Sequence, residues 1–182
     1  MTRWLYNILY PVVFLALLPG YLLHMKRRGG YRRHFWQRIG RYEPALADEL
    51  ERGEWTWIHA VSVGECYVAL RLMRTLRERE PGVRFVLTVN TSTAHKLAES
   101  EMDEPDRLLY FPLDWVPVMR RVMDRIRPAR LCIVETEIWP NLIRLARRAG
   151  ARVALVNGRM SDRSFRGYRR VRFAIRPLMR EF

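Results

Sequence analysis

The sequence predicts an α/β fold in which parallel strands alternate with helices. Short apolar runs rich in β-branched residues recur along the chain, and stretches with helical periodicity separate them. The helical stretches also carry N-cap residues and first-turn prolines. Because parallel strands need a crossover connection, this alternation is typical of βαβ units and a Rossmann-like parallel sheet.

The expected elements follow one another closely after residue 54. Strands are expected at residues 55–61, 83–89, 107–111, 130–135 and 152–156. Helices are expected at residues 65–79, 92–100, 115–126 and 139–149. Thr91 or Ser92 and Asp114 are predicted N-caps, Pro140 lies in a first turn, and Gly150 follows a helix end.

Two segments flank this alternating pattern. Residues 43–54 form a predicted polar linker before the first strand. The last stretch, from Ser161 to Phe182, is a basic helical segment with aromatic residues, and no closing strand follows it.

The N-terminal segment predicts a membrane anchor. Residues 4–25 are an apolar stretch of about the length that spans a bilayer. Both a kinked span and a shallow interfacial helix remain open, because polar or helix-breaking residues interrupt it: Asn7, Pro11, Pro19 and Gly20. A cleaved signal peptide is less well supported, since only Arg3 precedes the stretch and no small-residue cleavage pattern follows it.

The charge distribution supports the same interpretation. The chain has a net charge of +14, and its first 42 residues contain eight basic residues and no acidic one. Basic residues beside an apolar stretch favour the cytoplasmic side and anionic lipids, and the interface suits Tyr31, Phe35 and Trp36. We therefore expect residues 1–42 to anchor the protein at the cell inner membrane, with residues 43–182 on the cytoplasmic face.

Nucleic-acid binding and metal or disulfide frameworks are not expected. The N-terminal segment explains more than half of the net charge, and no stacking motif or nucleic-acid-binding signature is present. Cys66 and Cys132 form no CxxC pattern, which fits a reducing compartment. No metal site and no cofactor are predicted.

Polar residues follow every predicted strand. Ligands of open α/β sheets bind beyond the carboxyl ends of the strands, so these clusters predict one site along that edge. In strand order, the clusters are Ser62, Gly64 and Glu65; Asn90, Thr91, Ser92 and Thr93; Pro112 and Asp114; Glu135, Thr136, Glu137 and Asn141; and Asn157, Gly158, Arg159, Met160 and Ser161.

Several of these residues also have a purely structural interpretation. Ser62 could cap the following helix with Glu65 as its capping-box partner, which is compatible with a functional role for Glu65. Asp114 is expected to be a plain N-cap. His59, inside an apolar strand, is expected to be a core histidine.

The remaining chemistry points to carboxylates. The chain has no GxGxxG after its first strand, no Walker A or GxSxG motif, and no His/Cys metal cluster. A glutamate near a helix N-terminus could accept a proton from an attacking hydroxyl. A second carboxylate could stabilise positive charge that develops on a sugar ring.

Four stretches together resemble one enzyme family. They are WIHAVSVGE (57–65), YFPLD (110–114), ETEIWPNLI (135–143) and NGRMSDRSFRGY (157–168). In this order, after an N-terminal anchor, they resemble the transferases of 3-deoxy-D-manno-octulosonic acid (Kdo) in lipopolysaccharide synthesis. The resemblance implies a metal-independent GT-B glycosyltransferase. Its donor would be CMP-Kdo, its acceptor the lipid A precursor (lipid IVA), and inner-membrane lipids would be further partners.

The resemblance also implies roles for single residues. Glu65 takes the place of the general base, and Glu135 that of a second essential carboxylate. The implied substrate-binding residues are Ser62, Gly64, Thr91, Thr93, Asp114, Glu137, Asn141, Asn157, Arg159 and Ser161. The chain departs from the family pattern in TVNTSTAH, at Val89 and Ala94, and again at Gly158 and Met160, which affects the acceptor details.

The length implies an incomplete enzyme. The donor-binding second domain of the family is missing, so residues 43–182 are expected to be the N-terminal acceptor-binding domain of a fragment that is inactive alone. The alternative is a membrane-anchored phosphate- or nucleotide-binding α/β module without catalysis. The lack of phosphate-binding loops disfavours it.

Overall fold

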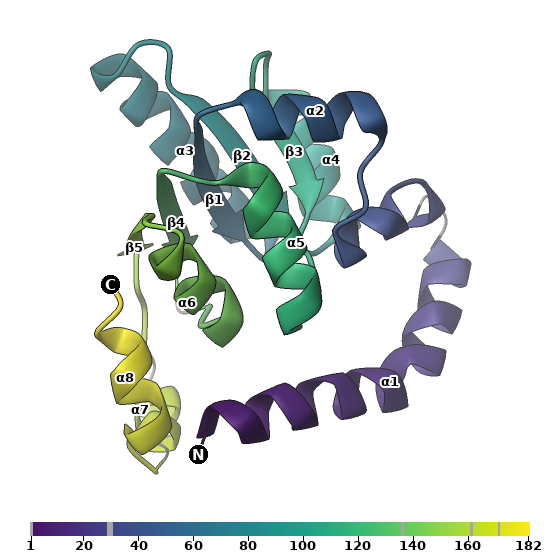
Figure 1. Cartoon of the computed structure of the whole chain (residues 1–182), viewed down its shortest axis with the longest axis vertical. Coiled ribbons are helices and arrows are strands. Elements are labelled where there is room, and N and C mark those ends of the chain that lie inside the picture. Colours follow the sequence, from purple (N-terminus) through teal and green to yellow (C-terminus); the bar gives the residue numbers. More distant parts are fainter. Residues whose placement is uncertain (1, 29–30, 136, 161, 171) are drawn as a thin grey trace.

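Five parallel strands form the centre of the protein (Figure 1). The computed structural model describes residues 2–28, 31–135, 137–160, 162–170 and 172–182. The strands are β1 (Trp55–Ala60), β2 (Arg84–Val89), β3 (Arg107–Tyr110), β4 (Arg130–Val134) and β5 (Arg152–Val156). Their order is β3-β2-β1-β4-β5, and every neighbouring pair is parallel. The predicted Rossmann-like sheet is therefore confirmed.

The four predicted helices are present and cover both faces of the sheet. They are α3 (Val63–Arg79), α4 (Ser92–Glu101), α5 (Val116–Ile126) and α6 (Pro140–Arg148). Successive side chains of β1 point to opposite faces, so Trp57 joins the core with α5 and α6 while Ile58 joins the core with α3 and α4. All six residues of β1 are buried, which explains why its apolar residues do not alternate with exposed polar ones.

The predicted linker at residues 43–54 is wrong in part, because it contains helix α2 (Pro44–Arg52). Pro44 occupies the first turn, where its fixed φ suits a helix. Ala47 and Leu50 are buried, and the Leu50 carbonyl accepts a 2.9 Å hydrogen bond from Trp55 Nε1. Only a narrow apolar stripe of α2 faces the body of the protein. Because the segment is polar overall, it was predicted to be a linker rather than a helix.

The N-terminal stretch forms helix α1 (Thr2–Arg28), which continues through Pro11 and Pro19. Figure 1 shows α1 on the side of the molecule toward which the strands run. Among the described helices, none has the length and apolar character needed to cross a membrane.

Part of the predicted basic segment belongs to the folded body. The 3-10 helix η1 (Tyr31–Ile39) contacts β3. Tyr110 N donates to Gln37 Oε1 at 3.0 Å, and Leu113 N donates to the Arg38 carbonyl at 2.8 Å. Arg38 is itself buried, so not every basic side chain of this segment faces solvent.

The C-terminal segment is helical, as predicted. It forms α7 (Asp162–Arg170) and α8 (Arg172–Met179), and α8 contacts α6. Leu178 is buried, whereas Phe165 and Phe173 are exposed. This segment therefore packs against the body through the contact of α8 with α6.

Candidate functional site

The sheet reverses its strand order between β1 and β4, which are neighbours at its centre. From β1 the chain builds outward through β2 and β3, and it then returns to β4 on the other side. In open α/β sheets, ligands bind in the crevice that such a reversal leaves beyond the carboxyl ends. Glu65 follows β1 and Glu135 follows β4, so the two predicted catalytic carboxylates flank this position.

Glu65 lies in the first turn of α3 and is only 6% exposed. Its Oε2 accepts from Val61 N at 2.7 Å, and its Oε1 accepts from Ser62 Oγ at 2.9 Å. Ser62 Oγ in turn accepts from Glu65 N at 3.3 Å. The predicted capping box is confirmed, although Glu65 reaches the amide before the cap rather than that of the cap itself. Each carboxylate oxygen keeps a further lone pair, so the cap leaves room for a proton.

Glu135 has a left-handed backbone conformation, with φ of 59°. Such a conformation costs a residue other than glycine about 1–3 kcal/mol, and it is found most often at functional sites. The Glu135 amide donates to the Val156 carbonyl at 2.8 Å, which extends the pairing of β4 with β5. The strand pairing therefore fixes the backbone where the chain turns away from the sheet.

Glu137 connects the two predicted catalytic carboxylates. Burial raises its pKa, and the negative charges of Glu65 and Glu135 raise it further. Glu137 thus lies near enough to Glu65 and to Glu135 for their charges to favour its protonated form. No group of three or more His, Cys, Asp or Glu residues in the described ranges is arranged to hold a metal ion. Metal independence stays a prediction.

Asp114 caps a different helix from the one expected. The N-cap of α5 is Trp115, which makes no side-chain cap bond. Asp114 is fully buried and accepts from Asn141 N at 3.0 Å and from Leu142 N at 2.8 Å, both at the start of α6. Burial raises the pKa of Asp114 to about 6. The expectation of a local N-cap is therefore wrong, because the carboxylate bonds to free amides that are distant in sequence.

The polar face of helix α1 forms hydrogen bonds to the buried residues Asp114 and Asn141. Tyr6 Oη donates to Asp114 Oδ2 at 2.7 Å, and Tyr10 Oη accepts from Asp114 N at 3.1 Å. Asn141 Nδ2 donates to Asn7 Oδ1 at 2.9 Å and to the Asp114 carbonyl at 2.6 Å. Sequence reasoning missed these contacts, although three polar side chains at positions i, i+1 and i+4 of an apolar helix are a usable signal.

The other side of α1 is apolar and open to the surroundings. Its exposed large apolar side chains are Trp4, Leu5, Ile8, Leu9, Val12, Val13 and Leu15; Leu17 is exposed as well but lines the pocket described next. This arrangement is the reverse of that in an ordinary surface helix, whose apolar stripe faces the core.

A pocket of about 360 Å³ lies between α1 and the carboxyl ends of the strands. Apolar side chains form most of its wall, and Arg38 and Asn90 also reach it. The full set is Tyr10, Phe14, Leu17, Arg38, Asn90, Phe111, Pro112, Leu113 and Trp139.

The remaining predicted site residues are spread along the same edge. Thr91 is the N-cap of α4, as predicted, because its Oγ1 accepts from Ala94 N at 3.2 Å. Thr93, Asn157 and Arg159 are exposed. Ser161 lies outside the described residues. Substrate binding by any of these residues, and by the buried Asp114 and Asn141, stays a prediction.

Gly64 has no structural need to be glycine. It is exposed in the first turn of α3, and a Cβ there would have only Ser62 Oγ near it, at 3.9 Å, outside its own helix backbone. Glycine weakens a helix, so the position favours a functional interpretation. The absent side chain leaves open space beside Glu65.

His59 is a core histidine, as predicted. It is fully buried, its Nδ1 lies 3.0 Å from Thr88 Oγ1, and its ring stacks on Phe111 at 3.9 Å. Burial lowers the pKa of His59 to about 3, so the ring is neutral at physiological pH. Within the described part of the chain, its Nε2 has no hydrogen-bond partner.

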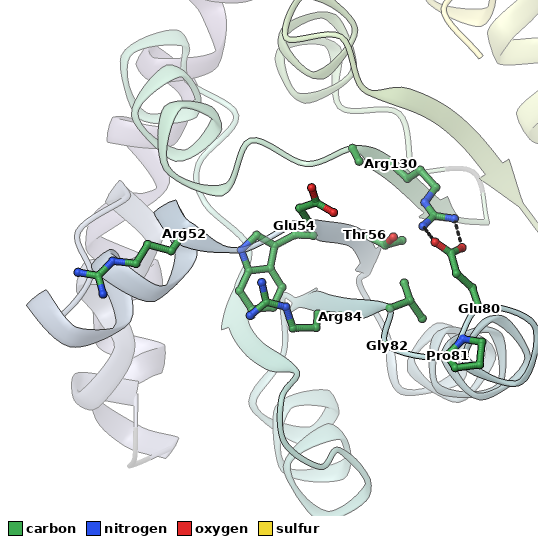
Figure 2. Close-up of a pocket in the computed structure, with 11 residues that line it drawn as sticks. Arg52, Glu54, Thr56, Glu80, Pro81, Gly82, Arg84 and Arg130 are labelled. Atoms are coloured by element: carbon green, nitrogen blue, oxygen red, sulfur yellow. Dashed lines mark hydrogen bonds and ion pairs between the residues drawn. The ribbon is translucent and has the colours of Figure 1, made fainter.

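A second pocket, of about 440 Å³, lies at the opposite edge of the sheet (Figure 2). It lies beside the amino ends of β1, β2 and β4. Arg130 forms two 2.6 Å bonds to Glu80 there, and the Arg84 guanidinium lies 4.6 Å from the centre of the Trp55 ring. Because ligands of such sheets bind at the carboxyl ends, this pocket lies away from the candidate site.

Comparisons with known proteins identify the family of the chain. A family model described as 3-deoxy-D-manno-octulosonic-acid transferase (Kdo transferase) matches residues 33–182. A Kdo transferase of Chlamydia pneumoniae is 30% identical over 158 residues, which are 86% of this chain and 35% of that protein. A Kdo transferase of Rickettsia felis is 29% identical over 126 residues, which are 69% of this chain and 27% of that protein.

A bifunctional glycosyltransferase/methyltransferase of Fusobacterium nucleatum is 30% identical over 135 residues, or 73% of this chain and 21% of that protein. The chain thus spans between about a fifth and about a third of the length of these relatives. The family model covers the whole sheet and every helix from α2 onward. The chain belongs to the Kdo transferase family.

Proposed function

We propose that the protein containing this chain transfers Kdo from CMP-Kdo to a hydroxyl group of a lipid A precursor (lipid IVA). In this proposal the chain forms the acceptor side of a two-domain, metal-independent GT-B enzyme. The observation that carries the proposal is the group of three carboxylates at the strand-order reversal, in a member of the Kdo transferase family.

The proposed step is a displacement at the anomeric carbon of Kdo. The acceptor oxygen forms a bond to that carbon while the bond to the CMP phosphate oxygen breaks, and CMP leaves with both bonding electrons. Glu65 accepts the proton of the acceptor hydroxyl. Glu135 stabilises the positive charge that develops on the sugar ring. Glu137 is a third carboxyl group near these two, and burial together with their charges raises its pKa.

We also propose that the protein lies on the cytoplasmic face of the cell inner membrane through α1. The helix turns its polar side chains toward Asp114 and Asn141 and its apolar side chains outward. A helix of this kind suits the plane of the interface, where the apolar side enters the acyl boundary. The reacting edge of the sheet would then face the lipid that carries the acceptor.

The activity is tested in the full-length protein that carries this chain. Glu65→Gln keeps the size and part of the capping capacity but removes the basicity. We expect transfer from CMP-Kdo to fall by about 10²–10⁴-fold, with little change in stability. Glu99→Gln, at an exposed position of α4, is the control and should transfer normally. An active Glu65→Gln enzyme that unfolds earlier would instead assign Glu65 to helix capping alone.

A further inference from the structure

The pocket between α1 and the sheet is an apolar site next to the proposed reaction centre. Its volume of about 360 Å³ falls in the range of small-molecule sites, about 300–1,000 Å³. Phe14 and Leu17 of α1 form one wall, and Phe111, Leu113 and Trp139 contribute to the rest. The ring centres of Phe111 and Trp139 are 5.0 Å apart, so the aromatic part of the wall is packed together.

Arg38 gives this apolar pocket a cationic side. It is 7% exposed, its Nη2 donates to the Asn90 carbonyl at 2.7 Å, and its guanidinium lies 4.8 Å from the centre of the Tyr110 ring. These contacts fix the guanidinium in place. A long apolar wall with one fixed arginine suits an amphipathic anion, such as an acyl chain near a phosphate group.

The pocket and two of the predicted site carboxylates share one segment of the chain. Trp139 lines the pocket, and the same segment carries Glu135 and Glu137 only a few residues earlier. A single ligand could therefore place its sugar beside the carboxylates and its chain in the pocket.

We propose that this pocket binds an acyl chain of the glycolipid acceptor, with Arg38 facing an anionic group of the same molecule. The proposal rests on the proposed transfer to a lipid acceptor and adds where that lipid is held. Helix α1 is then part of the acceptor site as well as a membrane contact. The pocket exists only because the polar face of α1 is bonded to Asp114 and Asn141.

Helix α1 offers a matched pair of variants. Leu17 lines the pocket and is 66% exposed, whereas Leu15 is 62% exposed and is not among the pocket-lining residues. Both Leu→Asp changes place the same charge on the same helix and weaken general lipid contact alike. Only Leu17→Asp also places a charge at the pocket. Comparison of the two variants therefore distinguishes binding of the acyl chain in the pocket from general membrane contact.

The experiment is photo-crosslinking of the full chain in phosphatidylcholine nanodiscs. The probe is glucosamine 1-phosphate with an N-linked dodecanoyl chain that ends in a diazirine, and mass spectrometry maps the labelled residues. We expect labelling at Phe111–Leu113 and Trp139, and competition by the unlabelled probe. Leu17→Asp should lower this labelling at least fivefold, and Leu15→Asp should leave it within twofold. Arg38→Gln should weaken competition by the phosphorylated probe but not by its dephosphorylated form.

The opposite results would overturn the proposal. A diazirine-bearing phosphatidylcholine that labels the same residues as strongly would assign the pocket to bilayer lipid. Equal labelling of the two leucine variants would show that the pocket does not bind the acyl chain of the probe. Labelling needs no donor and no turnover, so its failure leaves the transfer test intact, and a failed transfer test leaves the labelling result interpretable.

Discussion

Tyr6 donates a 2.7 Å hydrogen bond to the buried carboxylate of Asp114, a residue 108 positions further along the chain. The same carboxylate accepts the first free amides of α6. The buried Asp114 carboxylate therefore links α1 to the start of α6, the helix that follows the Glu135–Glu137 segment.

Tyr6→Phe should destabilise the protein. Hydrogen bonds to charged groups contribute about 1.5–3 kcal/mol, and the substitution leaves a buried carboxylate with one donor fewer. We expect a loss of that size in the free energy of unfolding, measured by urea denaturation. Tyr67→Phe, at an exposed position of α3, is the control and should change it by less than about 0.5 kcal/mol. Equal stability of the two variants would show that α1 is not held through Asp114.

The pKa of Asp114 should fall in a measurable range and respond to Tyr6. Burial raises it to about 6, while the Tyr6 hydrogen bond acts to lower it. A carbon-detected NMR titration of the side-chain carboxyl should therefore give a midpoint near 6 in the wild type and a higher one in Tyr6→Phe. An equal titration midpoint of Asp114 in the wild type and in Tyr6→Phe would contradict the hydrogen bond between Tyr6 and Asp114.

The same shift predicts how stability depends on pH. A raised pKa means that the folded state holds the proton more tightly than the unfolded state, whose value is about 3.8. The contribution of Asp114 protonation to the free energy of unfolding is therefore complete below about pH 3.8, and it is lost as the pH rises through about 6. Relative to Asp114→Asn, which does not titrate, the wild type should lose up to about 3 kcal/mol between these limits. A constant difference in unfolding free energy across this range would argue against the shift.

Gly64→Ala should stabilise the fold and impair the enzyme. Alanine favours a helix over glycine by up to about 1 kcal/mol, and the new methyl group meets no clash within the chain. Transfer in the full-length protein should nevertheless fall, because the methyl group enters the open space beside Glu65. Gly167→Ala in α7 also has open space around it and is the matched control. Its activity should be unchanged, and full activity of Gly64→Ala would remove Gly64 from the site.

The chain by itself should not catalyse transfer. It spans about a third or less of its relatives, and the proposed donor-binding half lies outside it. Without that half, the donor is not oriented against the acceptor hydroxyl, and a proximity contribution of about 7–11 kcal/mol is largely lost. Incubation of the purified chain with CMP-Kdo and lipid IVA should give no product above background. Robust turnover would show that this chain holds the donor.

The strands and the four long helices could be predicted because each carries its own local signal. β1 is buried on both faces and is therefore mostly apolar, and α3 starts after a serine that caps it. Helix α2 escaped prediction because only a few of its side chains reach the core. Its polar surface resembles that of a loop in composition.

The candidate site likewise has features that could be predicted from the sequence and features that could not. Glu65 and Glu135 could be placed on one edge from the order of strands alone. Their electrostatic contact with Glu137 depends on where a loop folds, which no local pattern specifies. The structural role of Asp114 was hidden for the same reason, since its partners lie 27, 28 and 108 residues away in sequence.

The inverted orientation of α1 has a thermodynamic consequence. In the proposed membrane contact, a bilayer that covers the outer side of α1 would bind the folded form, in which the inner side is bonded to Asp114 and Asn141. Any ligand that binds only the folded state shifts the folding equilibrium by mass action. Lipid would then act as a folding ligand for the reacting edge, and detergent or delipidation would loosen Asp114 and α6 before the distant end of the sheet.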